Sequence, residues 1–152
     1  MTLAALCVAG CGGVPADRAS AGVAAELQLK QLMEWVIDPA ADVVWDSVKS
    51  ISNEQGTREI APRTQEEWDA VRNAAAALIE AGVSLTAEGR PRGGEDWVRA
   101  VRGMTGAARA AFDAAQAKNA AAVFDAGGRL YNACAGCHRQ FAPQLNASAG
   151  PR

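Results

Sequence analysis

Residues 130–141 of the chain read Leu-Tyr-Asn-Ala-Cys-Ala-Gly-Cys-His-Arg-Gln-Phe, with Cys134 and Cys137 three positions apart and His138 directly after them. This spacing is the signature of covalent c-type haem attachment. Residues i and i+3 lie on one face of a helix, so both thiols can reach the two vinyl groups on one porphyrin edge. The imidazole of His138 can then bind the iron. The stretch therefore predicts one covalently attached haem c with His138 as its proximal iron ligand.

Three other kinds of site use paired cysteines. A thioredoxin-like redox site needs a βαβ setting, whereas this pair lies in an alanine-rich helical stretch near the end of the sequence. A structural zinc site needs four ligands, and the sequence has a single His and no second CxxC pair. A disulfide between Cys134 and Cys137 would close a very short loop within a helix, which fits disulfide geometry poorly. Haem attachment is the interpretation we prefer.

The composition favours one helical domain. The chain has 152 residues, enough for a single buried core, and it is rich in alanine and poor in β-branched and aromatic residues, which favours helix. The net charge of −2 argues against a nucleic-acid partner, which would require a basic surface. Redox partner proteins stay compatible with this charge, because a local charged rim can act without changing the total.

Apolar residues recur at three- and four-residue steps in four segments, as on the buried face of a helix. The predicted helices span about residues 21–50, 64–82, 95–117 and 120–141. Within the first, Asp38 and Pro39 predict a bend, because proline removes a backbone donor. Thr64 and Glu67 form a capping box that starts the second. The fold class predicted is all-α, an antiparallel four-helix bundle with haem attached near the C-terminus.

No segment has strand periodicity over a useful length, and the turn-forming residues 52–56 predict a loop that runs on to Arg63. The bundle is expected over residues 21–143 and a disordered tail over residues 144–152. Gly127 lies one heptad before the first haem-motif cysteine. It predicts either a close approach by a haem edge or a neighbouring helix, or a simple helix break.

The start of the sequence predicts export. Residues 1–13 are small and apolar and too short to span a membrane, so we interpret them as a signal or lipoprotein leader, followed by a linker over residues 14–20. Residues 8–11 read Val-Ala-Gly-Cys and resemble the bacterial lipobox, which makes Cys11 a candidate lipidation site. A plain secretory signal is the alternative, because no Lys or Arg precedes the apolar run. Both predict the periplasm of a bacterium, and lipidation would add membrane anchoring.

The chain resembles the class II c-type cytochromes, the cytochrome c′ family, over about residues 22–143. The similar stretches are the haem motif at 130–138, Leu-Met-Glu-Trp-Val-Ile-Asp-Pro-Ala-Ala-Asp at 32–42, and residues 61–68 and 95–98. In the high-spin branch of this family no protein atom fills the sixth iron position, and small gases bind. In the low-spin branch a Met from the first helix fills it, and the protein carries electrons. Met33 matches that Met, so the resemblance implies the low-spin branch with Met33 as sixth ligand.

The residues alone leave alternatives to Met33. A Met on an apolar helical face usually packs in the core, and Met104 on the third predicted helix is a rival ligand. The predicted function is periplasmic transfer of single electrons through a haem with His/Met ligation. The alternative is a five-coordinate haem protein that binds NO or CO. We expect no enzymatic activity, because a peroxidase needs a polar distal acid–base residue and the single His is assigned to the iron.

The expected partners are redox proteins, including a larger oxidoreductase to which the chain could dock as a noncatalytic subunit, and a homodimer would be unsurprising. The aromatic residues are expected to pack in the core. This holds for the tryptophans Trp35, Trp45, Trp68 and Trp97, and for Phe124, Tyr131 and Phe141, which flank the haem motif at helical spacing. The alternative for the last three is that they line the haem.

Overall fold

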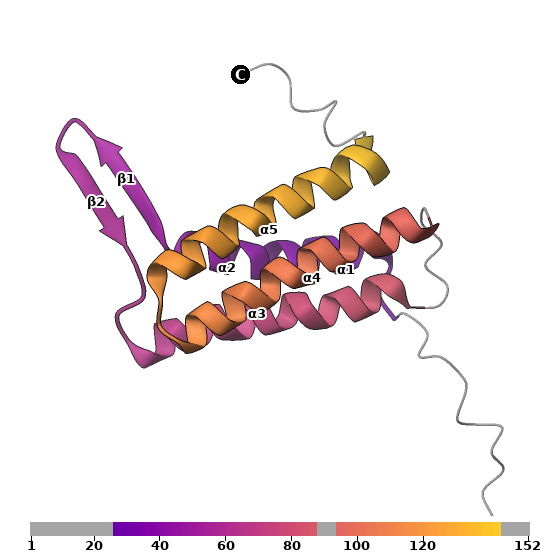
Figure 1. Cartoon of the computed structure of the whole chain (residues 1–152), viewed down its shortest axis with the longest axis horizontal. Helices are drawn as coiled ribbons and strands as arrows, with labels where there is room; N and C mark the ends of the chain where they lie inside the picture. Colours follow the sequence, from indigo (N-terminus) through magenta and orange to yellow (C-terminus); the bar gives the residue numbers. More distant parts are fainter. Residues whose placement is uncertain (1–25, 88–93, 144–152) are drawn as a thin grey trace, which may run out of the picture.

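The structure is a computed structural model that describes residues 26–87 and 94–143 (Figure 1). The described residues are mostly helical, with four helical segments and one small two-stranded sheet. In chain order the elements are α1 (Leu29–Leu32), η2 (Met33–Ile37), α2 (Asp38–Ser47), β1 (Lys49–Asn53), β2 (Gly56–Ile60), α3 (Gln65–Thr86), α4 (Gly94–Gln116) and α5 (Ala120–Phe141). Because α1, η2 and α2 follow one another without a break, they form the first helical segment.

The predicted leader over residues 1–13 with Cys11, the linker over residues 14–20 and the tail over residues 144–152 lie outside the described residues. Within the described ranges, no helix combines the length and the apolar character needed to cross a membrane.

The first helical segment changes its hydrogen-bonding pattern midway. The turn from Met33 to Ile37 is π-helical, and the N–H of Asp38 donates to the carbonyl of Met33. The sequence predicts a bend at Asp38 and Pro39, whereas the structure has a π turn immediately before the proline. The spacing of the buried residues changes with it. Leu32 and Ile37 are five positions apart, whereas buried residues on an α-helical face are three or four positions apart. The segment is also shorter than the predicted 21–50, since the described residues before Leu29 are not helical.

The loop predicted after the first helix is wrong, because the chain forms an antiparallel hairpin there (Figure 1). Ser50 pairs with Glu59 and Ser52 with Thr57. The side chains of each pair also form a hydrogen bond, of 2.7 Å for the first pair and 2.9 Å for the second. Almost every residue of the two strands is exposed. A two-sided polar hairpin has no apolar–polar alternation, which is the pattern from which strands are predicted.

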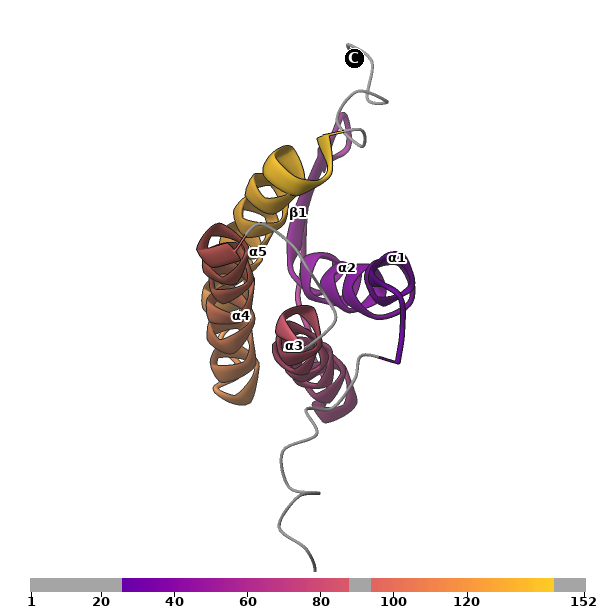
Figure 2. The same ribbon diagram turned by 90° about the vertical axis from the view of Figure 1, so that its right-hand side faces the viewer.

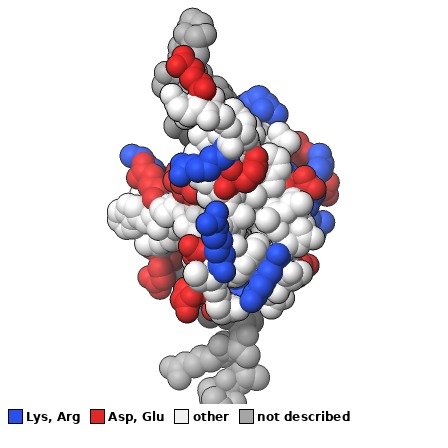
Figure 3. Space-filling model, turned by 90° about the vertical axis from the view of Figure 1, so that its left-hand side faces the viewer, with Lys and Arg blue, Asp and Glu red and all other residues white. Residues whose placement is uncertain are grey.

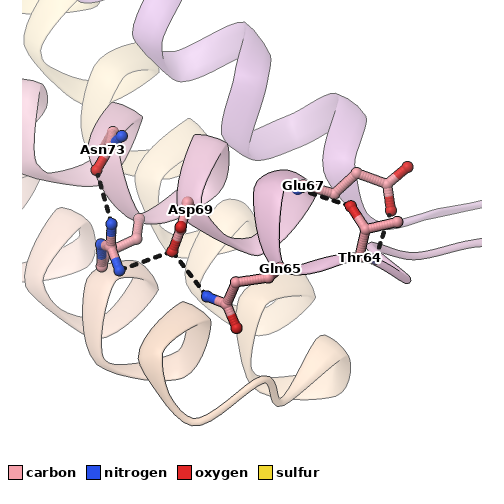
Figure 4. Close-up of polar contacts among 6 residues, drawn as sticks. Thr64, Gln65, Glu67, Asp69 and Asn73 are labelled. Carbon is pink, nitrogen blue, oxygen red and sulfur yellow. Dashed lines mark hydrogen bonds and ion pairs between the residues drawn. The ribbon is translucent and has the colours of Figure 1, made fainter.

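The capping box predicted for α3 is confirmed. The N–H of Glu67 donates to the hydroxyl oxygen of Thr64 at 3.2 Å, and the N–H of Thr64 donates to the Glu67 carboxylate at 3.0 Å (Figure 4). The Arg63 N–H also donates to the Glu67 carboxylate, and the bonds from Arg63 and Thr64 lower the pKa of Glu67, because backbone N–H groups stabilise the charged carboxylate. The cap starts α3 where the hairpin ends.

The helices pack in the order α2, α3, α4 and α5, so that α2 and α5 face each other on the remaining side (Figure 2). Many of the buried residues are alanines, which allow close helix approach. Among the described glycines, Gly82 of α3 has the least room, because a Cβ atom there would lie 2.1 Å from Cγ2 of Thr105 on α4. The helical prediction is thus confirmed at the level of four packed helical segments.

Candidate functional site

The haem motif lies in the last turns of α5. The helix is capped by Asn119, whose side chain accepts a hydrogen bond from the N–H of Ala122 at 3.0 Å, and it runs without a break from Ala120 to Phe141. Cys134, Cys137 and His138 are each half-buried, and both cysteines are free thiols. The structure therefore places the motif on a helix, as predicted, and gives no support to a disulfide between the two cysteines.

A small cavity joins this motif to the first helical segment. Its volume is about 30 Å³. Its polar and sulfur-bearing lining residues are Met33, Asp38, Met104, Cys134, Cys137 and His138. Apolar side chains from η2, α3, α4 and α5 complete the wall, among them Ile37, Leu85 and Val101. The fold thus brings the predicted sixth ligand to the predicted attachment residues from a distant part of the chain.

Both candidate methionines line the cavity, but their burial differs. Met104 is 6 % exposed and belongs to the core of the helical packing. Met33 is half-buried and lies on the π turn. A core methionine is held by its neighbours on several sides, whereas a half-buried one can reorient toward a bound group. This difference favours Met33 over Met104 as the residue with freedom to act as a ligand.

The π turn explains why Met33 and Asp38 reach the same cavity. In an α-helix, 3.6 residues make one turn, so side chains five positions apart point about 140° away from each other. In a π turn the hydrogen bond joins residues i and i+5, which places the second above the first. The Asp38 N–H makes this bond to the Met33 carbonyl. Sequence reasoning missed Asp38 as a site residue because α-helical spacing directs it elsewhere, and Pro39 was the one local signal of irregularity.

The two thiols are held in their neutral form. Burial, followed by the neighbouring Cys137 and Asp38, raises the pKa of Cys134 to about 11. Burial also raises the pKa of Cys137. Thioredoxin-like sites have the opposite property, since their attacking cysteine has a lowered pKa. The electrostatics therefore argue against a thiol–disulfide exchange site.

Asp38 is the charged residue that the cavity adds to the predicted site. Asp38 is exposed, but the partial desolvation of its carboxyl raises the pKa above the usual value, and the nearby His138 imidazole acts in the opposite direction. Asp42 and Glu34 raise the pKa further by repulsion. The carboxylate therefore lies within electrostatic reach of the predicted iron ligand.

Trp45 and Gly127 form a contact between α2 and α5, which answers the question that Gly127 raised in the sequence. The indole N–H of Trp45 donates to the Gly127 carbonyl at 3.0 Å, and a Cβ atom on Gly127 would lie 3.4 Å from Cδ1 of Trp45. The Trp45 ring also meets Tyr131 edge-on, with centroids 6.2 Å apart. The helix does not break at Gly127. A neighbouring helix approaches there, as one of the two alternatives predicted.

Trp97 and Phe141 pack near the end of the haem motif. Their rings meet edge-on with centroids 5.1 Å apart, and the Trp97 indole N–H donates to the Leu85 carbonyl at 2.8 Å. Since Leu85 also lines the cavity, this contact ties the end of α3 to the end of α5. Trp97 is buried, as predicted.

Three aromatic residues are placed differently from the prediction. Trp35 is 61 % exposed, Phe124 is 59 % exposed and Tyr131 is 63 % exposed. The prediction that they pack in the core is wrong. Trp35 lies in the π turn, whose extra residue rotates it away from the core. Phe124 and Tyr131 are seven residues apart on α5, on a stripe beside the buried one.

A larger cavity, of about 430 Å³, lies between α2, the end of β2 and the start of α3. Its charged lining residues are Asp42, Asp46 and Glu67. Its lining contains no thiol, thioether or imidazole, so it offers no haem ligand. Nor does any part of the chain that the structure describes hold a group of three or more His, Cys, Asp or Glu residues placed to bind a metal ion. The candidate haem ligands therefore meet at the smaller cavity.

Comparison of the chain with known protein families, with curated proteins and with solved structures finds no match. The similarity to the cytochrome c′ family therefore depends on the motifs in the sequence.

Proposed function

We propose that the chain is a periplasmic c-type cytochrome that carries single electrons, built as an antiparallel four-helix bundle of the cytochrome c′ class with haem attached near the C-terminus. Cys134 and Cys137 would attach the haem, His138 would be the proximal iron ligand and Met33 the sixth. The observation that carries the proposal is the cavity shared by Met33 and the haem motif. Residues far apart in sequence line this one cavity, and they are of the types that would ligate a low-spin haem c.

The donor chemistry of the cavity fits this group. Two neutral thiols, one imidazole and two thioethers line the cavity, together with apolar side chains and the Asp38 carboxylate. The volume of about 30 Å³ is far smaller than a porphyrin. Haem binding would therefore have to displace side chains or to separate η2 from α5, the two helical elements that carry Met33 and the motif.

Haem c, when bound, supplies a one-electron iron couple, and the protein tunes that couple. His138 would hold the iron from one side, and the Met33 thioether, a soft ligand, would raise the reduction potential. Ligation by Met33 would also close the sixth position to gases. Because His138 is the single histidine of the chain, a second imidazole ligand from the same chain is excluded.

The proposed partners are redox proteins. Figure 3 shows acidic and basic side chains interspersed on the face of the molecule that carries the hairpin. That face therefore has no surface of a single charge sign that would select an acidic or a basic partner. We propose no enzymatic activity of the chain alone, and a homodimer is compatible with the proposal.

Expression of the full chain in a bacterium that attaches haem c tests the proposal. We expect haem to stay on the polypeptide in a denaturing gel and the mass of the chain to increase by one haem. Replacing both cysteines, C134A and C137A together, should abolish this attachment, whereas C11S should not. A full-length chain that carries no covalent haem under these conditions would contradict the proposed function.

A further inference from the structure

Asp38 shares the small cavity with Met33 and His138. Its carboxylate makes no hydrogen bond or ion pair with another residue that the structure describes. Two other acidic residues of the same helical segment have a partner, since Glu34 pairs with Lys30 at 3.4 Å and Asp46 pairs with Lys49 at 2.8 Å. Asp38 thus brings a negative charge to the candidate site, and no cation among the described residues pairs with it.

The π turn is what brings this charge to the cavity. The turn ends with the bond from the Asp38 N–H to the Met33 carbonyl, and both side chains line the same space. Asp42, one α-helical turn further along, lines the larger cavity beside α3 instead. Two aspartates of one helix therefore differ in which cavity they line. Asp42 is consequently a matched control for Asp38.

A fixed negative charge beside a redox centre favours the more positive oxidation state. Asp38 is exposed, so solvent screens part of its charge, but it lines the same cavity as Met33 and His138, and at so close a position one charge still has a measurable effect. We propose, on the basis of the proposed function, that the negative charge of Asp38 lowers the reduction potential of the haem iron. In this role it opposes the raising effect of the Met33 thioether.

The test is the midpoint potential of the full chain with its haem, at neutral pH, for wild type, D38N, D38E and D42N. We expect D38N to raise the potential, so that the ratio of reduced to oxidised protein at a fixed ambient potential increases several-fold, where tenfold corresponds to about 59 mV for one electron. D38E keeps the charge and should stay near wild type. D42N should shift the ratio by less than half as much as D38N.

Optical spectra of the same samples separate the outcomes. D38N should keep the six-coordinate spectrum of the wild type, which shows that the potential changes without loss of a ligand. A D38N potential equal to that of wild type or of D42N would overturn the inference and leave the proposed function standing. Loss of the sixth ligand in D38N would also overturn it, because Asp38 would then act by shaping the π turn. A chain without covalent haem would overturn the proposed function and this inference together.

Discussion

The indole N–H of Trp45 donates a hydrogen bond to the carbonyl of Gly127 at 3.0 Å, and this bond joins the first helical segment to α5 about two helical turns before Cys134. The same helical segment and α5 also supply side chains to the small cavity. The bond is therefore a structural support of the candidate site, although neither residue lines it.

We expect W45F to lower the free energy of unfolding by about 1–2 kcal/mol, because the hydrogen bond is lost and the smaller ring fills less of the contact. The matched control is W35F, since Trp35 is 61 % exposed and its replacement should change stability by no more than about 0.5 kcal/mol. Denaturant unfolding followed by circular dichroism measures both. Equal effects of the two substitutions would contradict the role given to Trp45.

Gly82 should be intolerant of a side chain. A Cβ atom there would lie 2.1 Å from Cγ2 of Thr105, so G82A should destabilise the chain by about 1–3 kcal/mol through overpacking between α3 and α4. The variant T105S removes that methyl group. We expect G82A/T105S to recover most of the loss measured for G82A in thermal unfolding. A double variant as unstable as G82A would contradict the explanation that the clash with the Thr105 methyl group causes the loss of stability.

The chain without haem should lose stability at alkaline pH. The pKa of Cys134 is raised from 9.0 to about 11 in the folded chain, so the unfolded state releases this proton first as the pH rises. The contribution of the protonated Cys134 thiol to the free energy of unfolding is therefore complete below pH 9, and it decreases between about pH 9 and 11. Allowing for the partial exposure of the thiol, the loss is on the order of 1–2 kcal/mol.

Unfolding of the haem-free chain as a function of pH measures this effect, and C134S is the control. The serine variant should show a flatter dependence over the same range, because its hydroxyl does not titrate there. A wild-type stability that rises between pH 9 and 11 would contradict the burial of the thiol.

The proposed anchoring predicts an acylated Cys11, which lies outside the described residues. Mass spectrometry of the membrane fraction should find the mature chain beginning with a lipid-modified Cys11, and C11S should move the protein to the soluble periplasmic fraction. A wild-type chain that begins beyond Cys11 without a lipid would support the plain secretory signal instead.

Apolar periodicity predicted the helices well because it reports burial on one face. The capping box at Thr64 and the end of α5 before Pro143 depend on the local residue types, so both can be predicted directly from the sequence. The same property explains what was missed. The hairpin from Lys49 to Ile60 is exposed on nearly all sides, so it leaves no burial pattern to detect.

The sequence predicted the candidate ligands of the site, but it did not predict the residues around them. The spacing of Cys134, Cys137 and His138 predicts haem attachment without knowledge of the fold. Asp38 reaches the same cavity through one π turn, and a single change of helical register is invisible to a pattern that assumes 3.6 residues per turn. The exposure of Trp35 has the same origin.

The central claim is that Met33 faces the haem motif and fills the sixth iron position. The optical spectra of the oxidised and reduced full chain, compared for wild type, M33A and M104A, test it most directly. We predict a six-coordinate low-spin spectrum for wild type and M104A, and a five-coordinate spectrum with ready binding of CO for M33A. A wild type that is already five-coordinate, or a spectrum that changes in M104A and not in M33A, would contradict the claim.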